Sequence, residues 1–344
     1  MSKLKIISEK KVFFFIVPEG WTDLGRNRGS AIMRAHSPAY CLANTFGIEA
    51  KVISSSDIDI TKNVKLALEK FKKENIFLIW VKDLSNVKKW SNQGYTTIFD
   101  PVDMKLDSDY FRQAYNPDYF NFIFASSESH KNYLINLKAS PEKILIADHL
   151  STNITETISR NHFEKNKPVI GIIEPTPGEN VRAYKKQMLS DFELFCSKND
   201  LEFKFKDPSR LYRFNTKNGI VEGLQEAYSG IDIGVSLFCK REENFRFTIK
   251  PSTKLSAWAS FEIPCILSYD KYIEKYPFLK NLIIDSGNHS ESFDIILKLI
   301  YNREFWEESK SVMKLLKEDF SMHNCKKNYY ENILKKRAPR CKKS

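Results

Sequence analysis

Long hydrophobic runs are absent from this sequence. The first apolar run, Val12–Val17, is far shorter than the roughly 20 residues that cross a membrane as a helix. It is also too short for the apolar part of an export signal. We therefore expect a cytoplasmic protein. The missing signal also argues against a periplasmic binding protein.

Cysteine and histidine are few, and neither follows a metal-binding pattern. The 6 cysteines include no C-x-x-C pair and the 6 histidines no H-E-x-x-H pair, so a zinc site held by the protein has little support. Scattered cysteines are typical of a reducing compartment. A G-x-S-x-G motif is also missing, which argues against a nucleophilic serine triad. We predict no metal and no other cofactor.

The sequence does contain enough residues for two folded domains, together with an excess of positive charge. Its 344 residues exceed one ordinary domain, and 42% hydrophobic with 28% charged residues is typical of a globular protein. The net charge of +11 suggests an anionic partner such as a nucleotide, a nucleic acid, an acidic glycan or an anionic membrane. Charge alone does not choose among these, and a merely soluble lysine-rich protein is the alternative.

Short apolar runs alternate with helical patterns along both halves of the chain. This rhythm predicts parallel strands with helical crossovers. In the first half we expect strands at 12–17, 51–54, 76–81, 96–100, 122–126 and 143–148, with helices at 31–46 and 63–75, near 87 and from 128. In the second half we expect strands at 168–175, 201–206, 231–238, 264–268 and 281–285, with helices at 181–200 and 219–230 and one that opens at 250.

A polar stretch from Ser151 to Lys167 separates the two halves. The expected fold class is therefore α/β, with two doubly wound Rossmann-like domains facing a cleft, where such sheets bind ligands. We place the amino-terminal domain at 1–160 and the carboxyl-terminal domain at 161–344. The last helix is a candidate for crossing back to the first domain, and residues 335–344 form a basic tail.

One stretch of the second half, IKPSTKLSAWASFEIPCILS, combines helix-capping residues with lysines. Ser252 and Thr253 can cap a helix whose first turn holds Pro251, and Lys250 and Lys254 lie one turn apart. The free N–H groups at the amino end of a helix attract an anion, and both lysines would strengthen that attraction. A phosphate would fit there. The alternative is an ordinary capped helix with solvated lysines.

This stretch resembles the donor-site segment of GT-B glycosyltransferases, especially members similar to families 4 and 1, in which a helix opens with K-P-[AST]-[NT]-K-L. The match runs from Lys250 to Leu255, followed by Ala257–Ala259 and Pro264. The order of elements resembles theirs over nearly the whole chain, whereas the motif is confined to this stretch. The resemblance implies that a nucleotide-sugar donor is bound by Lys250, Ser252, Thr253 and Lys254.

Other candidate donor contacts lie near the starts of two helices. Gly29 precedes the first long helix, where a glycine lets backbone N–H groups approach a ligand closely; a plain surface turn is the alternative. Arg182 and Lys185 follow the first strand of the second half. The resemblance implies that a basic residue from this region contacts the donor diphosphate, without choosing which one.

Two carboxylates, Asp100 and Asp103, flank a proline turn at the end of an expected strand. Either could accept the proton of an acceptor hydroxyl at the edge of the cleft. The alternative is that Asp100 caps the following turn. A GT-B enzyme would stabilise the leaving nucleoside diphosphate with a helix dipole and basic side chains, so no metal need be invoked.

We therefore predict a glycosyltransferase that moves a sugar from a nucleotide-sugar donor to a saccharide or lipid-linked acceptor in surface polysaccharide assembly. One alternative is a nucleic-acid-modifying or nucleic-acid-binding protein, suggested by the basic balance. A second is a non-catalytic α/β binding protein, because many family 4 enzymes carry glutamates where this chain has Ile249 and Ala257. The basic tail suggests peripheral contact with anionic lipid or a charged polymer, or else a disordered solubilising segment.

Overall fold

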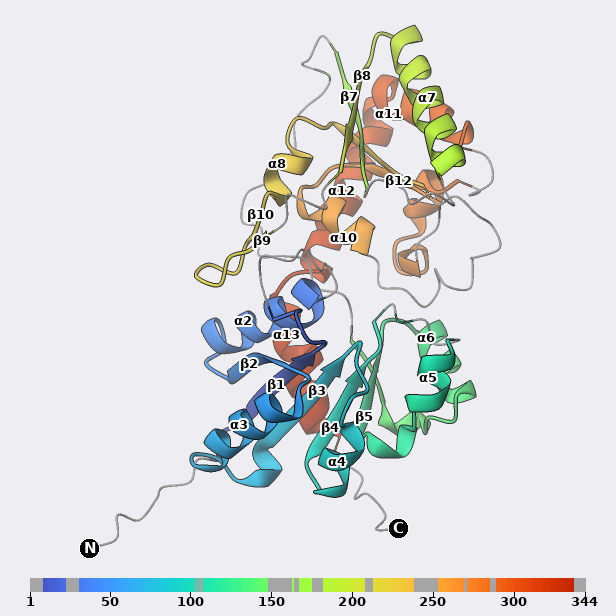
Figure 1. Ribbon diagram of the computed structural model, residues 1–344. Helices are drawn as coiled ribbons and strands as arrows, with labels where there is room; N and C mark the ends of the chain where they lie inside the picture. The colour runs from blue at the N-terminus through green and yellow to red at the C-terminus, as the bar shows by residue number, and fades with distance from the viewer. Residues whose placement is uncertain are drawn as a thin grey trace, which may run out of the picture.

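The fold is described from a computed structural model of the chain. The structure describes residues 9–22, 31–102, 104, 108–147, 163, 167–174, 182–207, 213–237, 253–268, 271–284 and 289–336. Within these ranges the strands form two separate parallel sheets, one from each half of the chain, and a short antiparallel hairpin. Figure 1 shows the two sheets one above the other, each flanked by helices.

The amino-terminal sheet has 6 parallel strands in the order β2-β1-β3-β4-β5-β6. The strands are β1 (Val12–Val17), β2 (Glu49–Ser54), β3 (Ile76–Val81), β4 (Thr96–Asp100), β5 (Phe122–Ala125) and β6 (Ile144–Ile146). The helices around them are the π-helix η1 (Ile32–His36), α2 (Ser37–Asn44), α3 (Asp57–Leu68), α4 (Val87–Asn92), α5 (Asp109–Ala114) and α6 (Glu128–Asn136). The chain adds β2 on one side of β1 and β3 on the other side. The carboxyl ends of β1 and β3 therefore form a topological switch point.

The unbroken apolar run of β1 follows from burial on both faces of this sheet. Successive side chains of a strand point to opposite faces, and here they enter two different core clusters. Phe13, Phe15 and Val17 belong to one cluster, whereas Val12, Phe14 and Ile16 belong to the other. Burial on both faces is typical of a parallel sheet covered by helices on each side.

The carboxyl-terminal sheet has 4 parallel strands in the order β12-β11-β7-β8. The strands are β7 (Val169–Ile173), β8 (Glu202–Lys206), β11 (Ile233–Ser236) and β12 (Cys265–Leu267). The accompanying helices are α7 (Arg182–Lys198), α8 (Leu224–Tyr228), α10 (Thr253–Ser260), α11 (Glu291–Tyr301) and α12 (Arg303–Asp319). The predicted fold class, α/β with two Rossmann-like domains, is confirmed.

The helix expected at 219–230 is wrong in its first half. That part contains strand β10 (Val221–Glu222), which pairs with β9 (Arg213–Phe214) in a hairpin, and only α8 is helical. Gly219 and Gly223 have φ values of +71° and +78°, a left-handed conformation that favours glycine and interrupts a helix. The hairpin reaches the other domain, where the Tyr40 hydroxyl of α2 donates to the Lys217 carbonyl at 3.3 Å.

Two other boundaries also differ from the expectation. Helix α3 begins at Asp57 rather than at 63, because the Ser56 side chain caps it by accepting a hydrogen bond from the Asp59 N–H. Of the strand expected at 281–285, the described part, 281–284, forms one parallel bridge, between Leu267 and Ile283. Capping and edge pairing of this kind are local effects that apolar periodicity does not encode.

The last described helices return to the amino-terminal domain. They are α13 (His323–Cys325), the π-helix η11 (Lys326–Glu331) and α14 (Asn332–Lys335), and α13 lies beside α2 in Figure 1. Tyr329 packs against Phe15 of β1 and Phe124 of β5, with ring centroids 5.6 and 5.2 Å apart. The amino-terminal core therefore includes residues from the end of the chain. The boundary predicted at 160 falls in 148–162, outside the described residues.

The basic tail predicted at 335–344 is described only through Lys336, and residues 337–344 lie outside the described residues. The Lys336 ammonium donates to the carbonyls of Glu142 and Ile144, both at 3.2 Å. None of the helices among the described residues is long and apolar enough to cross a membrane.

Truncating Tyr329 should measure how much the returning helices contribute to the amino-terminal core. Tyr329 is fully buried, so Tyr329→Ala is expected to lower the free energy of unfolding by about 3–5 kcal/mol, as large aromatic truncations do. Urea denaturation gives this quantity. Tyr301→Ala is the matched control, since Tyr301 is 72% exposed and should change stability by less than about 0.5 kcal/mol. Equal effects of the two substitutions would contradict the assignment of Tyr329 to the core.

Candidate functional site

Helix α10 is fixed against the carboxyl-terminal sheet by one aromatic side chain. Trp258 is buried, and its indole N–H donates to the Ser236 hydroxyl at the end of β11, at 3.0 Å. The ring lies directly on the backbone of β11, where a Cβ at Gly234 would come within 2.6 Å of it. Gly234 therefore lets the helix approach the strand. In Figure 1, α10 lies on the side of this sheet that faces the amino-terminal domain.

The first turn of α10 carries a lysine that is paired with a buried carboxylate. Lys254 forms an ion pair with Glu174, which directly follows β7. The Glu174 side chain is 3% exposed and the Lys254 side chain 29%. A backbone hydrogen bond of 3.1 Å from the Glu174 N–H to the Lys206 carbonyl also holds the glutamate at the end of the sheet. A positive charge is therefore fixed where the amino end of α10 meets the carboxyl end of β7.

Glu174 was not identified from the sequence. A glutamate followed by P-T-P is typical of a polar turn after a strand, and its buried position appears only once α10 is placed. The sequence feature that points to Glu174 is a carboxylate directly after the strand VIGII. Functional side chains in open α/β sheets lie at the ends of strands.

Several predicted donor contacts cannot be placed by the structure. Lys250, Ser252 and Gly29 lie outside the described residues, and so does Asp103. Arg182 and Lys185 belong to the first turn of α7, but only the backbone of these residues is described. Thr253 begins α10 and is exposed. The binding roles of these residues stay predictions.

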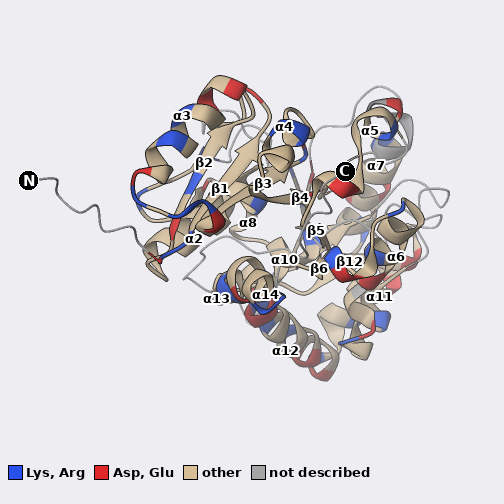
Figure 2. Ribbon diagram, turned by 90° about the horizontal axis from the view of Figure 1, so that it is seen from below, with Lys and Arg blue, Asp and Glu red and all other residues tan. Residues whose placement is uncertain are grey.

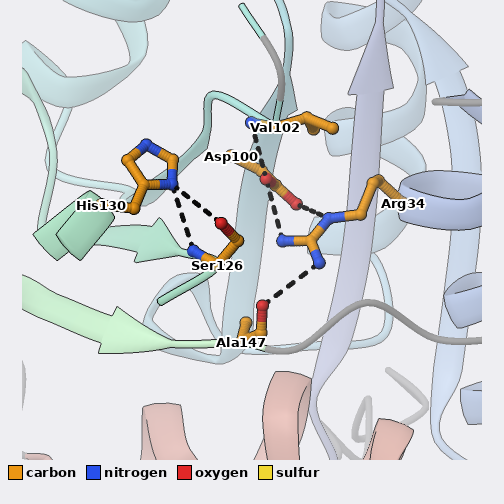
Figure 3. A network of polar contacts seen from close by, with 6 residues as sticks. All are labelled: Arg34, Asp100, Val102, Ser126, His130 and Ala147. Carbon is orange, nitrogen blue, oxygen red and sulfur yellow. Dashed lines mark hydrogen bonds and ion pairs between the residues drawn. The ribbon is translucent and has the colours of Figure 1, made fainter. Parts of the chain in front are cut away.

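A second polar cluster lies at the carboxyl ends of the amino-terminal strands (Figure 3). Arg34 of η1 donates two hydrogen bonds to the Asp100 carboxylate at the end of β4, from Nε to Oδ2 at 2.8 Å and from Nη2 to Oδ1 at 3.0 Å. Its Nη1 donates to the Ala147 carbonyl, beyond β6, at 3.2 Å. Both charged side chains are 1% exposed. The pair therefore ties a helix to two strand ends inside the core.

Asp100 also holds the turn that follows it. The Val102 N–H donates to Asp100 Oδ1 at 3.2 Å, and Val102 has a φ of +51°. Positive φ is strained for a β-branched residue and persists only where the surroundings enforce it. This geometry is the turn-capping alternative that the sequence offered for Asp100. Its role as a base stays a prediction, and both of its oxygens are engaged by Arg34.

His130 and Ser126 form a neighbouring polar pair after β5 (Figure 3). The Ser126 N–H donates to His130 Nδ1 at 3.1 Å, so the proton of the neutral imidazole lies on Nε2. The sequence did not single out His130 or Arg34. For Arg34 the available signal was a cation on the apolar side of a helix, between Ile32 and Ala35, which favours a buried ion pair.

No group of three or more histidine, cysteine, aspartate or glutamate side chains that could hold a metal ion occurs among the described residues. The chemistry that the described site offers is electrostatic. At the second sheet, a lysine paired with Glu174 lies at the positive end of a helix dipole. At the first sheet, a buried ion pair shapes a strained turn.

The fold is similar to that of several solved structures. The Anabaena protein Alr3699/HepE in complex with UDP superposes with a TM-score of 0.58, at 10% sequence identity, over 94% of this chain and 100% of its own. The apo form of the lipopolysaccharide outer core galactosyltransferase WaaB gives a TM-score of 0.57 at 13% identity, over 95% of this chain and 100% of its own. A UDP-GlcNAc 2-epimerase from Neisseria meningitidis, bound to UDP-GlcNAc, gives 0.51 at 14% identity, over 94% and 100%.

No protein-family profile matches the sequence, and no curated protein matches it significantly. At these low identities the structural similarity defines the architecture. It extends over both domains and includes nearly the full length of each structure named. The chain therefore has the GT-B fold, with two Rossmann-like α/β domains.

Proposed function

We propose that this chain is a glycosyltransferase that takes its sugar from a nucleotide-sugar donor. The observation that carries the proposal is Lys254, a cation in the first turn of α10 that a buried glutamate holds at the end of β7. The amino end of a helix together with a lysine favours a diphosphate. HepE, which shares the fold, was solved with UDP and with UDP-glucose, which supports a uridine nucleotide as the first donor to test.

The donor half of the site would act by stabilising the leaving group. During transfer the bond between the anomeric carbon and the diphosphate oxygen breaks, and its electron pair stays on the diphosphate. Lys254 and the α10 N–H groups would stabilise that negative charge, and we assign the same role to Lys250, Ser252 and Thr253. Gly29, Arg182 and Lys185 are proposed as further contacts of the donor. This arrangement of cations works without a metal ion.

The acceptor half would lie at the carboxyl ends of the amino-terminal strands. The acceptor hydroxyl attacks the anomeric carbon, and its proton must pass to a base. Asp103 and Asp100 are the candidates, and the Arg34–Asp100 pair positions the turn that leads to Asp103. We propose a saccharide or lipid-linked acceptor in surface polysaccharide assembly. WaaB, named as a lipopolysaccharide outer core galactosyltransferase, supports this choice.

A second candidate function is epimerisation of a UDP-sugar, because a UDP-GlcNAc 2-epimerase shares the fold. An epimerase needs no acceptor and returns an intact nucleotide-sugar, whereas a glycosyltransferase releases the nucleotide. A nucleic-acid-binding protein or a non-catalytic binding protein would do neither. The products of the reaction therefore separate these functions.

A donor screen tests the proposal directly. We expect the protein to release UDP from at least one UDP-sugar, and to do so more slowly from GDP-, ADP- and CMP-sugars, as measured by chromatography of the nucleotides with and without added glycans. The Lys254→Ala protein should release UDP at least about tenfold more slowly at a donor concentration below saturation. A new sugar isomer on an intact nucleotide would favour the epimerase, and no binding or turnover of any donor would refute both enzymes.

A further inference from the structure

Large apolar side chains are exposed together on helix α3. Ile58, Leu66 and Leu68 are 83%, 52% and 40% exposed. Elsewhere among the described residues, exposed large apolar side chains occur singly on separate elements, at Leu194, Phe205, Tyr301 and Leu315. Isolated exposed apolar residues are ordinary, whereas a group of them on one helix indicates an interaction surface.

The spacing of these residues gives α3 two different faces. The inner face consists of Ile60, Val64 and Ala67, which are buried in the core. On the outer face, Ile58, Lys62, Lys65 and Leu66 recur at intervals of three and four residues, which places them on one side of the helix. They line a shallow hollow of about 580 Å³ together with Asp57 and Thr61. In Figures 1 and 2, α3 lies at the periphery of the amino-terminal domain.

The charge of this outer face is positive. Lys62 and Lys65 are exposed there, whereas two of the helix's carboxylates are already engaged. Asp57 accepts hydrogen bonds from Lys89 at 2.7 and 2.8 Å, and Asp59 accepts one from the Ser54 N–H at 2.8 Å. Glu69, which is exposed, follows the last turn of the helix and is adjacent in sequence to Lys70. The partner of this face should therefore combine apolar character with negative charge.

We propose that the outer face of α3 docks on the surface of a bilayer that contains anionic phospholipid. Ile58 and Leu66 enter the boundary between headgroups and acyl chains, and Lys62 and Lys65 contact the phosphates. A symmetric dimer through the same face is less favourable, because it would bring the lysines of one copy against those of the other. The docking site lies on a folded helix and is distinct from the basic tail. It does not depend on the proposed donor chemistry, since vesicle binding is measured without nucleotide.

Sedimentation with lipid vesicles tests the proposal. The full chain should bind vesicles of phosphatidylcholine that contain phosphatidylglycerol, and bind vesicles of phosphatidylcholine alone at least about tenfold more weakly. Ile58→Ser/Leu66→Ser and Lys62→Gln/Lys65→Gln should each lower binding to the anionic vesicles by about tenfold or more. All four side chains are exposed on the outer face, so the melting temperatures of both variants should equal that of the wild type.

The matched control is Leu194→Ser/Leu315→Ser, which removes leucines that are 55% and 47% exposed from α7 and α12 and should bind like the wild type. Three results would overturn the proposal. The first is wild-type binding by both α3 variants, and the second is loss of binding only when residues 337–344 are deleted. The third is a concentration-dependent dimer that light scattering detects in the wild type and that Leu66→Ser dissociates.

Discussion

Lys254→Ala should weaken the binding of UDP by roughly tenfold to a hundredfold, because it removes a charge-assisted contact worth about 1.5–3 kcal/mol. The same substitution leaves the buried Glu174 carboxylate without this cation. We therefore also expect a loss of stability of about 1–3 kcal/mol. Calorimetric titration of UDP measures the first effect, and thermal unfolding without nucleotide measures the second.

A double variant separates these two effects. In Glu174→Gln/Lys254→Ala the buried negative charge is gone as well, so the melting temperature should recover toward that of the wild type while UDP binding stays weak. Glu174→Gln alone should bind UDP at least as tightly as the wild type, since it removes a negative charge close to the expected diphosphate. If the double variant bound UDP as well as the wild type, Lys254 would serve only to neutralise Glu174, and the donor site would lie elsewhere.

The second large effect is expected at the Arg34–Asp100 ion pair. Both side chains are almost completely buried, and removing one partner of such a pair takes the opposite charge away from the other, which costs about 3–5 kcal/mol. We expect this loss for both Asp100→Ala and Arg34→Met, measured as the free energy of unfolding in urea. The exposed ion pair Lys89–Asp57 is the control, because Lys89→Met should cost at most about 1 kcal/mol.

These variants also test whether Asp100 is a base. If it only positions the turn, the folded fractions of Asp100→Ala and Arg34→Met should lose transferase activity to a similar extent. If Asp100 accepts the acceptor proton, Asp100→Ala should be inactive while Arg34→Met keeps measurable activity at a temperature where both are folded. Removing a general base typically costs about a hundredfold to ten-thousandfold in rate.

The sheets and helix α10 could be predicted because their signals are local. The run Val12–Val17 is apolar at every position, which fits a strand buried on both faces, and the structure places it inside a parallel sheet, between β2 and β3. The α10 segment also carries its own signature, since capping residues, an apolar face and a closing proline all lie within it. Local patterns of this kind do not depend on the order of the strands.

The contacts that complete the site could not be predicted, because they join residues far apart in the chain. Glu174 and Lys254 are 80 positions apart, and Arg34 and Asp100 are 66 apart. Either pair becomes visible only when the strand order brings β7 next to α10, or η1 next to β4. The β9–β10 hairpin was missed for a different reason: two glycines with positive φ overrode an apparent helical pattern.

The returning helices have a consequence for synthesis on the ribosome. Domains of a growing chain usually fold in the order in which they emerge. Here the buried side chains of Cys325, Tyr329 and Ile333 complete the amino-terminal core, so that core stays unfinished until residue 333 has been translated. The carboxyl-terminal core uses residues up to Phe320 and can close first. The amino-terminal domain is thus synthesised first but completed last. Until its final helices are made, it exposes part of its apolar surface to chaperones.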